Sequence, residues 1–366
     1  MHNTLWRVTR YGALVSILFF AGYAYAGDNH NDYSNSRQIA AKDRSDAGRL
    51  AEKVKATMGK IEDKGLSILV LGSGGPAAGP KGRASAGYLV FVDGEPTLLM
   101  DAGGGTFQRL AQSGVNIKDL PYVLLTHLHV DHSSDLPAIL KTIFFHGNAA
   151  GDPRTSPIKI FGPGPGKGIT FPDSDITQYP PTTEFVDHEF GMEGGVYRYL
   201  HAFAPAVTNG QFNVETTDLA ADYSNPMMHT LIEDGGLTVK SMPVKHGPAP
   251  AVAYRIEYKG RSIVFSGDTN SETDNMVQIA IDADLLIYDT AILDDAPANP
   301  VMFQLHTTPT RMGQVAAAAN PDTLVLSHIT GVTEGNLNEV KQTVKRQGYN
   351  GKIRTARDLQ VYNLGD

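Results

Sequence analysis

Residues 126–132 read Thr126-His127-Leu128-His129-Val130-Asp131-His132 and directly follow the apolar run Val123-Leu124-Leu125. Three of the 12 histidines in this 366-residue chain, with one aspartate, lie within these seven positions. Side chains alternate along a strand, so a strand end would hold His127 and His129 on one side. The next turn would bring Asp131 and His132 to the head of a helix. Imidazole and carboxylate groups grouped in this way suit zinc, and less often iron or manganese. The heptapeptide therefore predicts a metal site at the edge of a sheet.

Three later apolar runs also deliver a histidine or an aspartate where the run ends. His246 follows Val244-Lys245, Asp268 closes the run that starts at Ile263, and His328 follows the run 323–327. Each of these residues alone is more typical of a structural role than of a ligand. Three together favour ligands, because polar residues at several strand ends meet at one sheet edge.

The composition excludes several classes of protein and of metal site. With no cysteine, the chain cannot form disulfides, a thiolate zinc site, an iron–sulfur cluster or a cysteine nucleophile. Any metal must be held by nitrogen and oxygen. The 41% hydrophobic and 19% charged residues are typical of a globular protein, and 38 glycines with 21 prolines argue against an all-helical bundle.

The first 26 residues are typical of a secretory signal peptide. Arg7 and Arg10 precede an apolar run, and Ala24-Tyr25-Ala26 forms a small-x-small cleavage site. The alternative is a membrane anchor, but the uncharged stretch 11–27 is short for a bilayer span of roughly 20 residues. We therefore expect a periplasmic or secreted protein with no stable membrane insertion after cleavage.

The mature chain would be more acidic than the full one. Removing two basic residues leaves 31 − 2 = 29 basic against 39 acidic side chains, a net charge of −10. Such a chain, without an obvious basic cluster, lacks the electrostatic footprint of a nucleic-acid binder.

Periodicity divides the rest of the chain into two halves, each of strands followed by a helix. Short apolar runs predict strands at 67–71, 88–92, 97–100 and 122–125, and again at 237–244, 252–258, 262–266, 285–288 and 324–327. Helical spacing predicts helices at 39–60, 135–145, 272–281, 310–319 and 337–347. We expect a polar segment and helix over 27–64, a catalytic domain over 65–366, and an irregular insertion or lid over 147–236.

The ligand candidates and several further motifs resemble the metallo-β-lactamase superfamily. Within it, the chain is most similar to the branch containing tRNA 3′-end endonuclease (RNase Z), arylsulfatases and phosphodiesterases. The supporting motifs are Leu71-Gly-Ser-Gly-Gly-Pro76, Leu99-Met-Asp101-Ala-Gly-Gly104, Ile160-Phe-Gly-Pro163, Ala253-Tyr254-Arg255, His306-Thr-Thr and Ala356-Arg-Asp358-Leu. The resemblance implies an α+β fold, a four-layer αββα sandwich of two mixed sheets with helices on the outer faces. Its motifs specify the fold and the metal site far better than the substrate.

The resemblance also implies a ligand set for two divalent cations, most readily Zn²⁺, with Mn²⁺ or Fe²⁺ as alternatives. His127, His129 and His246 would hold one ion. Asp131, His132 and His328 would hold the other, and Asp268 would bridge the two. Two such ions can share a hydroxide and direct it at an ester centre. Asp131 is further implied to orient or deprotonate the nucleophile, and Asp101 to orient a histidine ligand.

His306 is implied to be a general acid or a phosphate-contacting group. An imidazole suits protonation of a leaving oxygen. The alternative is a cap on the helix that starts near residue 310, although Thr307 and Thr308 are better caps. RNase Z-like sequences often carry a glutamate where this chain has Asp289, so support of His306 by Asp289 stays open at this point.

These features predict an exported binuclear hydrolase of a small phosphodiester or aryl sulfate ester. The flexible arm by which RNase Z grips tRNA has no room in the interval of 22 positions from His246 to Asp268, so we expect no nucleic-acid partner. Hydrolysis of a lactone or another carboxylic ester, or less readily of a β-lactam, is the alternative activity. A non-catalytic metal-binding protein is the alternative class, and a homodimer is possible.

Overall fold

The computed structural model describes residues 60–77, 79, 81–149, 151, 154, 156–167, 178–203, 213–295 and 300–365. The leader predicted over 1–26 and the segment 27–59 lie outside these residues, so the export prediction stays a prediction. None of the described helices combines the length and the apolar character needed to cross a lipid bilayer.

The first of two large sheets has seven strands in the order β16-β1-β2-β3-β4-β5-β8. These strands are β1 (Leu66–Gly72), β2 (Gly87–Val92), β3 (Glu95–Ala102), β4 (Tyr122–Leu124), β5 (Ile158–Pro163), β8 (Val214–Leu219) and β16 (Val361–Leu364). The pairs from β16 to β3 are antiparallel, whereas β3, β4, β5 and β8 run parallel.

The second sheet also has seven strands, in the order β15-β14-β13-β12-β11-β10-β9. They are β9 (His229–Asp234), β10 (Leu237–His246), β11 (Ala249–Tyr258), β12 (Arg261–Phe265), β13 (Leu285–Asp289), β14 (Thr323–Ser327) and β15 (Lys352–Thr355). The pairs from β9 to β12 are antiparallel, and β12 to β15 are parallel. Both sheets are therefore mixed, as expected.

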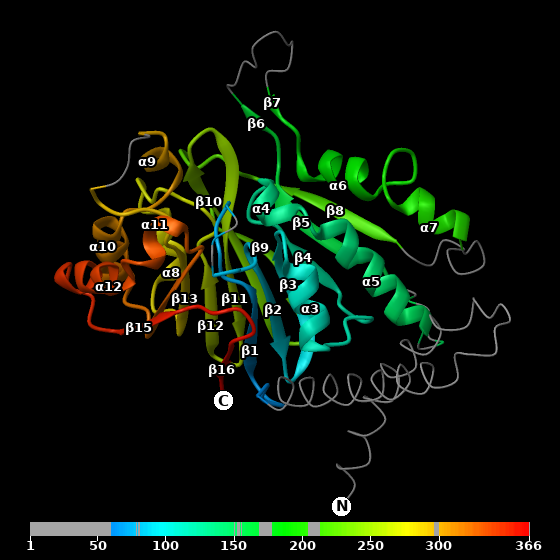
Figure 1. Ribbon diagram of the computed structural model, residues 1–366, viewed down its shortest axis with the longest axis horizontal. Helices are drawn as coiled ribbons and strands as arrows, with labels where there is room; N and C mark the ends of the chain where they lie inside the picture. The colour runs from blue at the N-terminus through cyan, green and yellow to red at the C-terminus, as the bar shows by residue number, and fades with distance from the viewer. Residues whose placement is uncertain are drawn as a thin grey trace, which may run out of the picture.

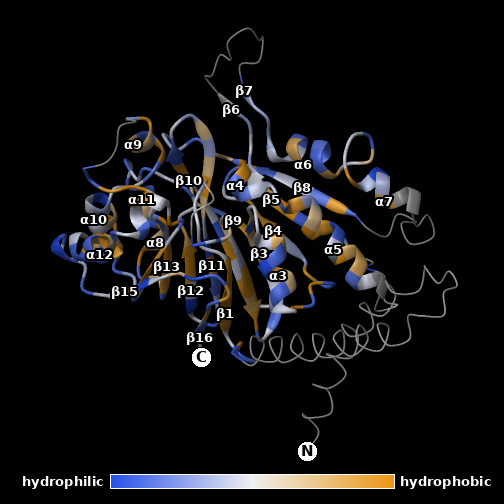
Figure 2. Ribbon diagram, viewed as in Figure 1, coloured by the Kyte–Doolittle hydropathy of each residue, from blue (hydrophilic) through white to orange (hydrophobic). Residues whose placement is uncertain are grey.

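Alternation along the strands explains why the two sheets pack face to face. In β1, Ile68 and Val70 lie in the core between the sheets, whereas Leu69 and Leu71 belong to a separate core on the outer face. A strand buried on both faces is apolar at nearly every position. β1 is buried throughout its length, and Ser67 is its one polar side chain. In Figure 2 the hydrophobic residues accordingly concentrate in the strands.

Helices cover the outer face of each sheet. On the first sheet lie α3 (Thr106–Ser113) and α5 (Leu136–Ala149), which contribute Leu110 and Ile139 to the outer core. On the second lie α8 (Asn275–Ala280), α10 (Pro309–Ala319) and α12 (Leu337–Arg346). Figure 1 shows these two helical layers on opposite sides of the paired sheets. The four-layer αββα sandwich and every strand expected from the sequence are confirmed.

The described residues of the segment 147–236 are largely in regular elements, which corrects the prediction of an irregular segment. It supplies strands β5 and β8 to the first sheet, β9 to the second, the small hairpin of β6 (Gly166–Lys167) and β7 (Gln178–Tyr179), and helices α6 (Thr182–Phe190) and α7 (Tyr197–Phe203). The hairpin projects from the body in Figure 1. Sequence analysis misses strand β8 because it is an edge strand, in which four of the six residues are polar and three are exposed.

Candidate metal centre

The carboxyl ends of strands from both sheets meet at one edge of the sandwich. His127 and His129 follow β4, and His132 lies in the one-turn helix α4 (Val130–Ser133). From the second sheet, His246 is the last residue of β10, whereas Asp268 and His328 follow β12 and β14. The edge where parallel strands end is the usual place for a site in sheets of this kind. The fold therefore brings together all seven residues proposed as ligands.

His127, His129 and His246 form the first cluster, in which one ring nitrogen of each lies within 4.8 Å of the others. The His246 Nε2 and His129 Nδ1 atoms are 3.2 Å apart. His246 Nδ1 is 2.7 Å from the Leu305 carbonyl oxygen. Donation of the Nδ1 proton to this carbonyl leaves Nε2 with a free lone pair that faces the cluster.

Asp131, His132, Asp268 and His328 form the second cluster. Asp131 Oδ2 and Asp268 Oδ2 lie 3.1 and 3.2 Å from His328 Nε2. Asp268 Oδ1 lies 3.4 Å from His132 Nε2, and Asp268 Oδ2 lies 3.9 Å from His127 Nε2 in the first cluster. Asp268 is thus the member of the second cluster that also faces the first, as the family resemblance implies for a bridging ligand.

The donor atoms fit divalent metal ions. His127 Nε2 and His132 Nε2 are buried and have no hydrogen-bond partner among the described residues. Buried polar atoms are nearly always satisfied, so two orphaned nitrogens beside carboxylates indicate that another group binds there. Nitrogen and carboxylate donors of this kind suit zinc and related ions.

Burial keeps the first cluster ready to bind a cation. It lowers the pKa of His127 well below its usual value, and the neighbouring histidines lower it further. Burial likewise lowers the pKa of His246 to about 4. Both rings are therefore neutral near pH 7, which is the form that binds a metal.

In the second cluster, by contrast, the two histidines His132 and His328 are protonated when no metal is bound. Burial alone would lower the pKa of His132 and His328, but nearby carboxylates, Asp268 foremost, outweigh it. The pKa of His328 rises to about 10. Conversely, burial would raise the pKa of Asp268, yet the charges of His328 and His132 hold it well below its usual value. A cation would replace these protons as the partner of Asp268.

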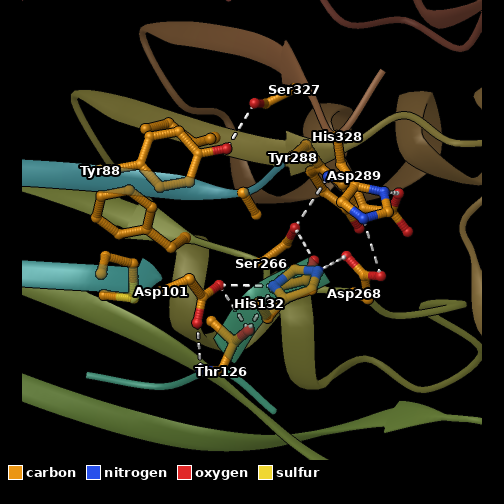
Figure 3. Close-up of a pocket in the computed structure, with 15 residues that line it drawn as sticks. Tyr88, Asp101, Thr126, His132, Ser266, Asp268, Tyr288, Asp289, Ser327 and His328 are labelled. Carbon is orange, nitrogen blue, oxygen red and sulfur yellow. Dashed lines mark hydrogen bonds and ion pairs between the residues drawn. The ribbon is translucent and has the colours of Figure 1, made fainter. Parts of the chain in front are cut away.

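Asp101 orients His132 from behind, as expected. Its Oδ2 atom lies 2.8 Å from His132 Nδ1, and its Oδ1 and Oδ2 accept hydrogen bonds from the backbone and hydroxyl of Thr126. Figure 3 shows Asp101 joined by dashed lines to both of these residues. Asp101 has φ 55°, a left-handed conformation that aspartate tolerates. Its carboxylate fixes the ring so that Nε2 faces the second cluster.

Asp289 supports His306, which settles the question left open by the sequence. Asp289 is the last residue of β13, and its Oδ2 lies 2.8 Å from His306 Nδ1. Burial lowers the pKa of His306, but the charge and hydrogen bond of Asp289 outweigh it and raise that pKa. The Asp289 side chain therefore reaches His306 and stabilises its protonated form. Thr308, and not His306, caps α10, because its side chain accepts a hydrogen bond from the Arg311 backbone.

A cavity of about 450 Å³ opens in front of both clusters. His129, Asp131, His246, Asp268 and His306 are among its walls. The other lining residues are Pro76, Ser85, Gly104, Val130, Ser134, Met302 and Leu305. A substrate in this cavity would meet both clusters and His306 together.

A partly buried ionic network holds the loop between β1 and β2, which supplies Pro76 and Ser85 to the cavity. Arg83 forms two hydrogen bonds with Glu334, of 2.5 and 3.1 Å, and also donates to Ser73. Asp358 accepts hydrogen bonds from the Ser73 and Ala84 backbones. Sequence analysis identified the motif around Asp358 only by its resemblance to the family and assigned it no contact. No pattern in the sequence indicated that Arg83 pairs with Glu334.

The chain is similar to known proteins both in sequence and in fold. The family model for the metallo-beta-lactamase superfamily matches residues 81–221, and that for the beta-lactamase superfamily domain matches 184–329. A Ribonuclease Z from Mycobacterium bovis is 30% identical over 303 residues, which is 80% of this chain and 96% of that protein.

Solved structures share the fold. The short form of human tRNase Z has a TM-score of 0.58 at 22% identity, with 81% of this chain and 98% of that one covered. Zn²⁺-bound PqqB from Methylobacterium extorquens has a TM-score of 0.55 at 16% identity, with 81% and 100% covered.

One expectation is wrong on this comparison. The curated relatives that cover 80% of the chain are named Ribonuclease Z, which overturns the exclusion of nucleic acid as a partner. The exclusion relied on the net charge of the whole chain and on the absence of the RNase Z arm between His246 and Asp268. Net charge does not report the charge of a local surface. The short interval of 22 positions from His246 to Asp268 excludes an arm at that place in the chain only.

Proposed function

Since the chain belongs to the metallo-β-lactamase superfamily of metallohydrolases, we propose that it is a binuclear, metal-dependent phosphodiesterase. The observation that carries this proposal is the position of His306. A protonatable imidazole, held by Asp289 at 2.8 Å, lines the same cavity as both ligand clusters. The site then contains what hydrolysis of a phosphodiester needs, namely two cation sites and a proton donor.

The seven clustered residues would hold the two ions. His127, His129 and His246 would bind one, and Asp131, His132 and His328 the other, with Asp268 shared. When bound, two divalent ions lower the pKa of water and stabilise negative charge on the phosphoryl oxygens. The all-nitrogen-and-oxygen donor set supports zinc, with manganese or iron as alternatives.

Asp131 would orient the attacking water. Burial would raise its pKa, but the hydrogen bond from His328 and the charge of His132 lower it. The carboxylate is therefore ionised near pH 7 and can accept a hydrogen bond from the nucleophile, beside the cavity that it lines.

His306 would protonate the leaving oxygen. Its Nδ1 atom is occupied by Asp289, so Nε2 is the nitrogen available to a substrate. An alkoxide is a poor leaving group, and a positioned acid typically contributes about 10²–10⁴-fold to its departure. Asp289 keeps this proton in place by raising the pKa of the ring.

The relatives named Ribonuclease Z support a phosphodiester as the scissile bond. Both RNA and a small phosphodiester are therefore candidates. An aryl sulfate ester has the same tetrahedral centre and is the second candidate bond, since the two clusters and His306 would act on it in the same way.

A substrate panel tests the proposal. The zinc-loaded protein is assayed with bis(4-nitrophenyl) phosphate, a precursor tRNA with a 3′ extension, 4-nitrophenyl sulfate and a lactone. We expect turnover of at least one phosphodiester, abolished by a chelator and by His127→Ala, and kept in His188→Ala, which changes an exposed histidine on α6. Turnover of the lactone alone, or activity that survives His127→Ala, would contradict the proposal.

We also propose that residues 1–26 direct export to the periplasm or the medium. The basic start, apolar run and small-x-small site support this. Fractionation of cells that produce the full chain, or the chain from residue 27, tests it. Retention of both forms in the cytoplasm would contradict export.

A further inference from the structure

The one-turn helix α9 (Met302–Leu305) carries apolar side chains next to His306. The His306 backbone N–H closes the turn on the Met302 carbonyl oxygen at 2.9 Å. Met302, Leu305 and His306 are spaced i, i+3 and i+4, so they share one face of this turn. All three line the cavity, whereas the exposed Phe303 of the same helix does not.

Two hydrogen bonds fix α9 against the ligand clusters. His246 Nδ1 donates to the Leu305 carbonyl oxygen at 2.7 Å, and the Gly247 N–H donates to the Gln304 carbonyl oxygen at 2.8 Å. The Leu305 side chain packs closely against the Gly247 backbone, since a Cβ atom added to Gly247 would lie 2.8 Å from Leu305 Cδ2. The apolar face of α9 therefore has a defined position relative to His246.

Apart from the two clusters and His306, the described residues that line the cavity offer no charge for a polar leaving group. No lysine or arginine is among the described residues that line it. The nearby cations are paired with carboxylates, Lys245 with Glu272 and both Lys81 and Arg83 with Glu334. Val130 and Pro76 add further apolar surface.

We propose that Met302 and Leu305 form the subsite for the leaving group, and that this subsite takes an apolar alkyl or aryl alcohol. The inference rests on the proposed function. If His306 protonates the leaving oxygen, the carbon on that oxygen lies within reach of the His306 ring. It therefore lies against the two side chains that share the helix face with His306.

The reaction balances as a hydrolysis. The water oxygen forms a bond to phosphorus while the bond from phosphorus to the alcohol oxygen breaks. His306 transfers its proton to the departing oxygen, and the proton lost by the attacking water restores the protonation of the site. The products are an alcohol, released against α9, and a phosphomonoester.

Two substrates of equal charge and similar leaving-group basicity test the subsite. They are the methyl phosphodiesters of phenol and of 4-butylphenol, because an alkyl substituent changes the basicity of the phenol oxygen little. Each fully buried methylene is worth about fourfold in kcat/KM. With the butyl chain about half buried, the zinc-loaded protein is expected to prefer the butylphenyl ester about tenfold.

Three variants assign the preference to the apolar face of α9. Met302→Gln keeps an unbranched side chain but is polar, and should reduce the preference to about one. Met302→Leu should keep it. Phe303→Gln, a change on the same helix outside the cavity, should leave both rates and the preference unaltered. Thermal unfolding of each variant shows whether the fold is intact.

The outcomes separate this inference from the proposed function. A tenfold preference that Met302→Gln removes and Phe303→Gln retains supports the subsite. Equal kcat/KM values for the two esters in the wild type overturn the subsite and leave the phosphodiesterase intact. Loss of the preference in a folded Phe303→Gln variant also overturns it. Absence of hydrolysis of every phosphodiester overturns the proposed function, and this inference with it.

Discussion

His306 Nδ1 lies 2.8 Å from Asp289 Oδ2, and the side chains of both residues are almost completely excluded from solvent. The other oxygen of the same carboxylate, Oδ1, lies 3.3 Å from His328 Nδ1. Asp289 therefore connects the proposed general acid to a proposed metal ligand. Sequence spacing gives no indication of this link, because His306 and His328 follow Asp289 by 17 and 39 residues.

Replacement of His306 should slow substrates with poor leaving groups most. We expect His306→Ala to lower kcat/KM for an alkyl or phenyl ester by about 10²–10⁴-fold, because the departing oxygen loses its proton donor. For a 4-nitrophenyl ester, whose leaving oxygen needs little help, the loss should be much smaller. Steady-state kinetics on both ester types measures the difference. An equal loss on both would contradict proton donation by His306.

Removal of the Asp289 charge should shift the pH profile. Asp289 raises the pKa of His306, and His306 acts only while protonated, so activity falls as the pH rises through that pKa. In Asp289→Asn the pKa drops, and the alkaline limb of kcat/KM should move to lower pH. The matched control is Asp284→Asn, which changes a carboxylate paired with Arg261 at 2.9 Å, outside the site. The same limb in Asp289→Asn and the wild type would refute the link.

Asp101 should control occupancy of the second ion site. Loss of a carboxylate behind a histidine ligand typically costs about 10–100-fold in metal affinity, and Asp101→Asn should do so through His132. Asp93→Asn is the matched control, since Asp93 also has a positive φ, of 48°, but lies in the turn between β2 and β3. Zinc content after dialysis, with titration of the metal-free proteins, measures the effect. Two full equivalents in Asp101→Asn at low free zinc would be inconsistent with it.

Zinc binding should release protons. In the metal-free protein the pKa of His132 is raised and that of His328 is about 10, so both rings are protonated at pH 7. Because ligands bind as neutral imidazoles, we expect about one or two protons released per protein. Calorimetric titration at pH 7 in two buffers of different ionisation enthalpy counts them. Identical heats in both buffers would contradict the prediction.

The same shift predicts how the stability of the metal-free protein depends on pH. The folded pKa of His328 lies above the unfolded value of about 6.5. Its contribution to the free energy of unfolding is therefore complete below about pH 6.5 and is lost as the pH rises through about 10. Denaturant titrations of the metal-free protein between pH 7 and 10 should show this loss of stability. With zinc bound, the free energy of unfolding should depend much less on pH over the same range.

Gly103 should be essential for the position of α4. A Cβ atom at this residue would lie 1.9 Å from the Asp131 carbonyl oxygen, so Gly103→Ala must displace the backbone that carries two proposed ligands. We expect a loss of about 1–3 kcal/mol in stability and a large loss of zinc affinity. The control is Gly331→Ala, where nothing lies within 4 Å of the added Cβ atom. Unchanged zinc affinity in Gly103→Ala would rule out this dependence.

The sequence alone was sufficient for the two-sheet fold and for the candidate ligands. Nearly continuous apolar runs such as 66–72 identify strands buried on both faces, and an apolar run that ends in histidine or aspartate identifies a sheet edge. Both signals are local, since they depend on the period of the backbone and on the chemistry of single residues. Edge strand β8 was missed, because its sequence is largely polar and has no apolar alternation. The other regular elements of 147–236 were missed as well, among them β5, although five of its six residues are buried.

The tertiary structure decided which residues act together. Asp289 beside His306, Arg83 beside Glu334, and Met302 on the wall of the cavity are contacts between residues brought together by strand order and by the packing of α9. No local pattern encodes them, because the distance between two side chains depends on the path of the chain between them. Protonation follows the same rule, since burial and charge neighbours, which only the fold supplies, set the pKa of each histidine.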